Sequence, residues 1–132
     1  MQLALAYFAT LVVFAIIDTL WLAVVARGFY RAELGDLLAP EVKLWAAVLF
    51  YVVYSAGIVI FAVMPAIRAE SLATALVMGA LFGFFAYATY DLTNLATLRD
   101  WPLRMSIVDI AWGTFITGIT ATVATYAARQ VA

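Results

Sequence analysis

Long runs of apolar residues dominate this chain, and short polar breaks divide them into four segments. The segments cover residues 3–26, 44–67, 71–98 and 103–128. Each segment holds the roughly 20 apolar residues that an α-helix needs to cross a bilayer. The pattern therefore predicts an all-α membrane protein with one domain, residues 1–132, in which four transmembrane helices form a compact bundle.

Basic residues are distributed unevenly between the polar breaks. In a four-span protein the first and third breaks share one side, and these breaks contain Arg27, Arg31, Lys43, Arg99 and Arg104. The opposite side, with both termini and the second break, has only Arg68 and Arg129. The positive-inside rule places the more basic side in the cytoplasm. We therefore expect both termini on the periplasmic side.

Within the first break, residues 29–38 mix apolar and charged positions at helical spacing. This pattern fits a short helix along the membrane interface, and it fits an ordinary polar connector equally well.

The composition supports a membrane protein and excludes several kinds of chemistry. Hydrophobic residues make up 68% of the chain and charged residues only 11%, whereas soluble domains are nearer half apolar and a quarter charged. The net charge of −1 gives no basic surface for nucleic acid. Without cysteine or histidine, the chain cannot form disulfides, His-ligated haem or a His-dependent triad. Only oxygen atoms remain as metal ligands, and no resident cofactor is expected.

Three aspartates interrupt the apolar segments. Asp18, Asp91 and Asp109 lie nine, eight and five positions from the nearest arginine of the basic side. At a rise of 1.5 Å per residue, these separations are roughly 13, 12 and 7 Å. All three acids thus fall in the same half of a core about 30 Å thick. Acids in hydrocarbon are costly and normally face the bundle interior or water, so we expect a shared polar pocket.

Aromatic and amide side chains accompany these acids. Trp21 and Trp112 each follow an aspartate at i+3, on the same helix face. Tyr87 and Asn94 share a stripe with Asp91, and the second segment adds Tyr51, Tyr54 and Ser55 at comparable depth. In the predicted ligand site, the charge-binding residues are Asp18, Asp91 and Asp109. Asn94 orients the ligand, and Trp21, Tyr87 and Trp112 line the wall.

Small residues recur at helical spacing in the third and fourth segments. Gly79 and Gly83 form a GxxxG motif, and Thr114, Gly118 and Thr122 form a second row. Such rows allow helices to approach closely in lipid. The approach could occur within the bundle or between two copies in a homodimer.

Several strings of the sequence resemble one bacterial family. They are YATYDLTNLATLRDWP (residues 87–102), VDIAWGT (108–114), IDTLWL (17–22) and ARGFYR (26–31). The resemblance is to the domain of unknown function 2177 family of small predicted inner-membrane proteins, and it covers essentially the whole chain. It implies a multi-pass, four-helix protein of the bacterial inner membrane with characteristic positions at Asp18, Trp21, Asp91, Asn94, Asp109 and Trp112. It implies no activity.

The acids favour a binding or transport site. Three nearby carboxyls cannot all ionise without a counter-charge, so at least one is expected to hold a proton. Such a site suits exchange of protons for a small cation, or an amine held against indole rings. Transport by only four helices would require a homodimer.

Three alternatives stay open. The acids could form a structural polar network that fixes helix register, or the chain could be an accessory or assembly subunit of a larger membrane complex. Enzymatic action on a lipid by paired carboxylates is the third, although no Ser/His or Cys/His constellation indicates a reaction. The expected partners are membrane lipids and either a second copy or a larger complex.

Overall fold

A computed structural model describes residues 1–131. Its helical elements, in chain order, are α1 (Gln2–Leu20), the π-helical turn η1 (Trp21–Val25), α2 (Arg27–Leu34), the 3₁₀ turn η2 (Gly35–Leu37), α3 (Leu44–Ile58), the π-helical turn η3 (Val59–Val63), α4 (Met64–Ala69), α5 (Leu72–Thr97) and α6 (Leu103–Arg129). No strand occurs in this described part of the chain.

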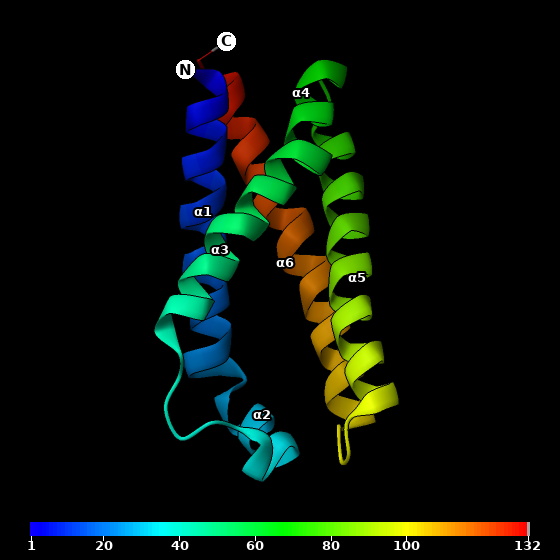
Figure 1. The fold of residues 1–132 in the computed structure, drawn as a ribbon. Coiled ribbons are helices and arrows are strands. Elements are labelled where there is room, and N and C mark those ends of the chain that lie inside the picture. Colours follow the sequence, from blue (N-terminus) through cyan, green and yellow to red (C-terminus); the bar gives the residue numbers. More distant parts are fainter. Residues whose placement is uncertain (132) are drawn as a thin grey trace.

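Within residues 1–131, four helical stretches are long and apolar enough to cross a membrane: Gln2–Val25, Leu44–Ala69, Leu72–Thr97 and Leu103–Arg129. They pack side by side, and both termini lie at one end of the bundle (Figure 1). The predicted all-α membrane bundle with both termini on the same side is therefore confirmed. We call the end of the bundle that carries both termini the terminal end. The opposite end, with α2 and the α5–α6 connection, is called the α2 end.

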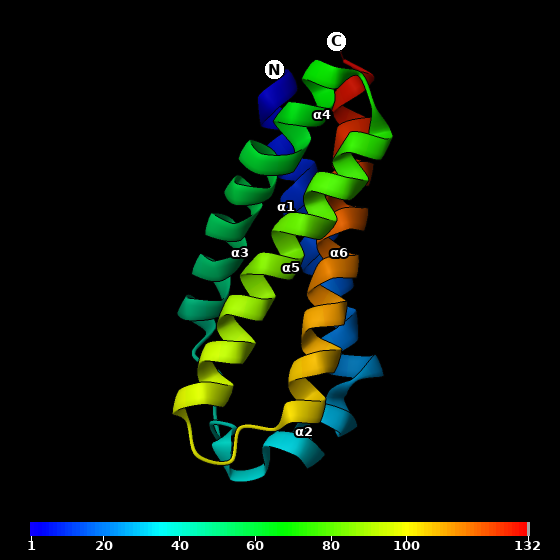
Figure 2. The same ribbon diagram turned by 90° about the vertical axis from the view of Figure 1, so that its right-hand side faces the viewer.

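The helices pack most tightly where α5 meets α6, which run side by side along their length (Figure 2). Glycines allow this approach. A Cβ on Gly79 would lie 2.8 Å from the carbonyl oxygen of Thr117, and a Cβ on Gly83 would overlap the carbonyl oxygen of Gly113. The GxxxG motif therefore packs α5 on α6 inside the bundle.

The residues of α6 that pack against these glycines are each one position earlier than the small-residue row predicted from the sequence. Gly113, Thr117 and Ala121 lie opposite Gly79 and Gly83. Of the predicted row, Gly118 is buried against α5, whereas Thr114 and Thr122 are only partly buried. The difference arises because rotation about the helix axis is set by packing, which residue spacing alone does not define.

Side-chain size in the core changes along the bundle. Toward the terminal end the buried residues are mostly alanines: Ala6, Ala62, Ala66, Ala75, Ala124 and Ala128. These small side chains let all four helices converge. Farther along, α3 packs against α1 and diverges from α5 (Figure 1). The core there is built from Phe14, Ile58, Ile116 and aromatic rings, and this widening makes room for cavities.

Residues 29–38 belong largely to α2 and the η2 turn, so the break is helical. The turn begins at Gly35, which has a positive φ of 53° that suits glycine. Arg104 of α6 contacts α2 in two ways: its Nε lies 3.2 Å from Glu33 Oε1, and its guanidinium lies 5.5 Å from the Phe29 ring centre. The first break therefore forms a short helix that packs against the bundle at the α2 end.

Candidate functional site

Asp18 lies near the end of α1 and is only 6% exposed. The Tyr51 hydroxyl of α3 donates to its Oδ2 at 2.9 Å, and Trp112 Nε1 of α6 donates to its Oδ1 at 3.1 Å. One carboxyl group therefore connects three of the bundle helices, and each of its oxygens has a donor.

Asp109 on α6 has a different set of contacts. The Tyr30 hydroxyl of α2 donates to Asp109 Oδ1 at 2.9 Å, and the same Tyr30 oxygen accepts from Trp21 Nε1 at 3.2 Å. Burial raises the pKa of the Tyr30 phenol, so it remains a donor. The second oxygen, Asp109 Oδ2, receives no hydrogen bond from a tyrosine, tryptophan or backbone donor within residues 1–131, and the carboxyl group of Asp91 lies within its reach. Asp109 thus keeps one acceptor for another group.

The two tryptophans connect these carboxyl groups. Trp21 and Trp112 stack face to face, with ring centroids 4.2 Å apart and planes inclined by 7°. Trp21 is the first residue of η1, a π-helical turn that shifts the helical register, as single π turns near functional sites often do. A continuous set of contacts therefore runs from Tyr30 through the indole pair to Asp18.

Asp91 on α5 is fully buried. Neither of its carboxyl oxygens receives a hydrogen bond from a donor group among residues 1–131, and its carboxyl group interacts with that of Asp109. An ionised carboxylate without donors is costly to bury. Asp91 is therefore the least satisfied polar group of the bundle interior described here.

A cavity of about 450 Å³ lies among these groups. We call it the intramembrane cavity, and it is lined by Asp18, Leu22, Ala47, Phe50, Tyr51, Tyr54, Ala86, Tyr87, Tyr90, Asp109 and Trp112. Phe50 on α3 is 42% exposed and Tyr90 on α5 is 55% exposed. The cavity therefore opens sideways, where α3 diverges from α5.

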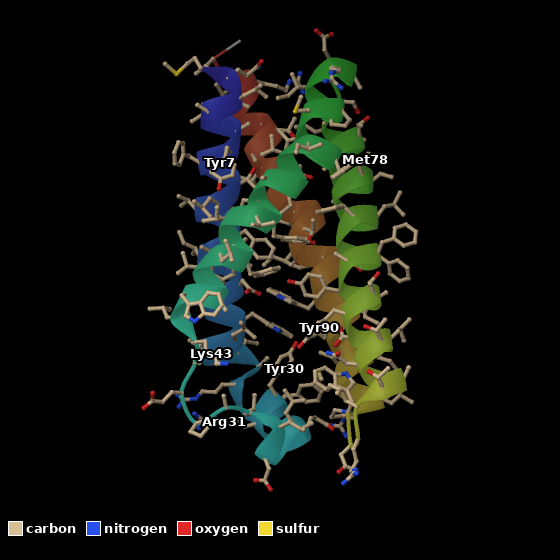
Figure 3. The ribbon with its side chains drawn as sticks, viewed as in Figure 1. Tyr7, Tyr30, Arg31, Lys43, Met78 and Tyr90 are labelled. Atoms are coloured by element: carbon tan, nitrogen blue, oxygen red, sulfur yellow. The ribbon has the colours of Figure 1, made fainter. Side chains whose placement is uncertain are left out.

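A second cavity, of about 590 Å³, lies between the intramembrane cavity and α2. We call it the interfacial cavity. It shares Leu22, Tyr90 and Asp109 with the first. Figure 3 shows Tyr30 directed from α2 into the bundle, close to Tyr90 of α5 in that view, with Arg31 beside it on α2. Asp109 is thus the acid that both cavities reach.

The structure brings most of the predicted site residues together. Asp18, Tyr87, Asp109 and Trp112 line the intramembrane cavity, and Trp21 stacks on Trp112 without lining it. Tyr87 is held by close packing, since its ring fills the space that a Cβ on Gly113 would occupy.

Two of the predicted residues lie elsewhere. Asp91 is buried beside Asp109 and lines neither cavity. Asn94 also lines neither cavity, and its side chain makes no hydrogen bond to an aspartate within residues 1–131. In the same part of the chain, no three His, Cys, Asp or Glu side chains are close enough together to hold a metal ion.

Tyr30, Phe50 and Tyr90 are site residues that the sequence did not reveal. Tyr30 lies in a polar break, and only the folding of α2 against the bundle brings its hydroxyl to Asp109. Tyr90 occupies an exposed position of α5. The helical spacing of residues 29–38 and the family string ARGFYR, which contains Tyr30, were the signals that could have pointed to this residue.

Comparison with known proteins supports the family resemblance. The model of the family described as Predicted membrane protein (DUF2177) matches residues 3–126. The chain belongs to this family. A search of curated proteins and of solved structures found no match. The DUF2177 description gives membrane location and no activity, so the function has to be argued from the geometry of the cavities.

Proposed function

We propose that this DUF2177 protein binds a small organic cation, an amine or a quaternary ammonium, in the intramembrane cavity. The observation that carries the proposal is the composition of the cavity wall. Two carboxyl groups and six aromatic rings line it, and no basic residue is among the described lining residues. Aromatic faces attract cations, most strongly where water is scarce. The wall is therefore complementary to positive charge.

The size of the cavity favours an organic cation over a metal ion. A volume of about 450 Å³ falls within the range of roughly 300–1,000 Å³ typical of small-molecule sites. A metal ion also needs several oxygen ligands at short distance, and the described residues supply no such cluster.

The carboxyl groups have distinct roles in this proposal. Asp109 offers Oδ2 to the cation in place of the proton it shares with Asp91, and the side chains of Trp112 and Tyr87 line the same cavity. Asp18, held by its two donors, adds negative charge to the same cavity lining. Asp91 holds a proton when the cavity is empty, because two adjacent carboxyl groups cannot both ionise without a counter-charge.

A bound cation supplies that counter-charge, so binding favours release of the proton from the Asp91–Asp109 pair. In this proposal, transport rests on the exchange of a cation for a proton at this site. Such transport would take place in the bacterial inner membrane, with the more basic α2 end toward the cytoplasm.

A thermal-shift experiment on detergent-purified protein tests the binding proposal. Choline and its neutral isostere 3,3-dimethylbutan-1-ol are compared at equal ionic strength, set with sodium chloride. Choline is expected to raise the melting temperature by several degrees, and the neutral isostere to leave it unchanged. The choline effect is expected to vanish in Asp109→Asn and to persist in the control Asp36→Asn, an exposed acid outside both cavities. Equal stabilisation by both compounds would refute the proposal.

One observation favours a second function, a purely structural polar network. Both oxygens of Asp18 already accept hydrogen bonds from neighbouring helices, as a carboxyl that fixes helix register would. In that case choline would not shift the melting temperature of any variant, and each aspartate-to-asparagine change would act on stability alone.

A further inference from the structure

The interfacial cavity differs from its neighbour in charge. Its lining residues, at the α2 end, are Leu22, Ala23, Arg27, Tyr30, Arg31, Leu34, Leu38, Ala39, Pro40, Val42, Tyr90, Trp101, Met105 and Asp109. Arg27 and Arg31 lie four residues apart on α2, so they share one helix face. Neither arginine forms an ion pair within residues 1–131. Two arginine side chains therefore line this cavity without an ion-pair partner among the described residues.

Side-chain hydrogen-bond donors also outnumber side-chain acceptors among the residues that line this cavity. Trp101 Nε1 is buried and has no acceptor among the described residues. The Tyr30 hydroxyl already donates to Asp109, the one acid of the described lining. An unpaired buried donor is a cost that a ligand oxygen can remove. The wall as a whole is suited to a group rich in oxygen acceptors and negative charge.

We infer that the interfacial cavity binds a phosphate group through Arg27 and Arg31. A guanidinium group matches phosphate because its N–H groups form paired hydrogen bonds with two phosphate oxygens. The inference is independent of the proposed cation site, since it rests on different residues and on the opposite charge.

The remaining wall indicates where the phosphate comes from. Leu34, Leu38, Val42 and Met105 give the cavity an apolar side, and it lies at the end of the bundle where the candidate membrane spans Gln2–Val25 and Leu103–Arg129 have their α2-end limits. A phospholipid places its phosphate at that depth and its glycerol and acyl chains against apolar surface. A lipid-borne phosphate uses both sides of the cavity, whereas free phosphate uses only the basic side.

The test compares three probes by thermal shift at fixed ionic strength: short-chain phosphatidylglycerol, diacylglycerol with the same chains, and inorganic phosphate. The lipid phosphate is expected to stabilise the wild-type protein by several degrees, and diacylglycerol is expected to have no effect. The stabilisation is expected to be lost in the double variant Arg27→Gln/Arg31→Gln. The control Arg99→Gln, which removes a basic residue of the same end outside the cavity, is expected to respond as the wild type does.

The outcomes separate the sources of phosphate. Stabilisation by the phospholipid alone, lost in the double variant, supports a lipid site. Equal stabilisation by inorganic phosphate, also lost in the double variant, supports a site for free phosphate. No response to either probe, or an unchanged response in the double variant, overturns the inference.

A second measurement keeps the test valid if the double variant does not fold. Wild-type protein in phosphatidylglycerol vesicles is crosslinked with a photoactivatable phosphatidylglycerol, and the labelled residues are mapped by mass spectrometry. Labels at Leu34, Leu38 or Val42 support the inference. Labels confined to lipid-facing positions such as Val48 and Val53, which are exposed on α3, contradict it.

Discussion

Trp21 and Trp112 stack with their ring centroids 4.2 Å apart, and each indole nitrogen donates away from the stack to a different partner. Trp112 donates to Asp18 and Trp21 donates to Tyr30, which in turn donates to Asp109. The pair therefore joins two carboxyl groups that share no direct hydrogen bond. A displacement of one carboxyl group can therefore be passed to the other through the two indoles and Tyr30.

The stack makes a spectroscopic prediction. Two parallel indoles at this distance couple electronically and should give an exciton couplet in the circular dichroism spectrum. We expect Trp21→Phe to abolish the couplet and Trp45→Phe to retain it, because Trp45 is 70% exposed and takes no part in the stack. A couplet that survives Trp21→Phe would mean that the indoles do not stack as described.

The membrane bundle could be predicted from the sequence because each membrane-spanning helix corresponds to one long, unbroken apolar run. Four apolar runs separated by short charged breaks leave few other arrangements for a chain of this length. The π-helical turns η1 and η3 could not be predicted, since their sequences, WLAVV and VIFAV, are as apolar as the helices around them. What selects them is packing between helices.

The sequence predicted at what depth in the membrane the candidate site lies. It predicted less well which neighbouring helix each side chain faces. Counting from the arginines places Asp18 and Asp109 at similar levels, and both line the same cavity. Asp91 and Asn94 share a stripe with Tyr87 in the sequence, yet only Tyr87 reaches that cavity. A helical stripe spanning seven residues is broad enough to face different neighbours at its two ends, and only tertiary packing decides between them.

Helix packing around the site gives a stability prediction. Gly83→Ala is expected to destabilise the protein by about 1–3 kcal/mol, as overpacking of a tight contact usually does, because the added Cβ meets the backbone of α6. Gly28→Ala is the matched control, since a Cβ there meets nothing within 4 Å.

Unfolding in mixed detergent micelles, followed by circular dichroism, measures both glycine variants. Equal stability of the two variants would show that the α5–α6 contact is looser than the structure indicates.

The Tyr30–Asp109 hydrogen bond predicts how firmly α2 is held. Tyr30→Phe removes the donor to Asp109 and the acceptor of Trp21, so α2 should open more often. Hydrogen exchange within residues 27–34 is expected to accelerate several-fold, with little change in α5. Tyr7→Phe serves as the control because Tyr7 bonds the carbonyl oxygen of Val52, in α3 and away from α2. Unchanged exchange in α2 would show that other contacts hold this helix.

Proton release is expected to accompany cation binding, if the proposed function holds. Choline is permanently charged through its quaternary nitrogen, so protons that appear in weakly buffered solution come from the protein. We expect release of up to about one proton per choline bound, because bound positive charge favours ionisation of a neighbouring carboxyl. In Asp91→Asn, choline should still bind but release little proton. Release that is undiminished in Asp91→Asn would assign the proton to another group.

The most direct test of the cation site uses the tryptophans on its wall. In a Trp45→Phe/Trp101→Phe background only Trp21 and Trp112 remain, so fluorescence reports from beside the intramembrane cavity. We predict a saturable change of emission with choline, none with 3,3-dimethylbutan-1-ol, and loss of the choline response on adding Asp109→Asn. A response that is the same for both compounds, or that survives Asp109→Asn, would contradict a site built on charge.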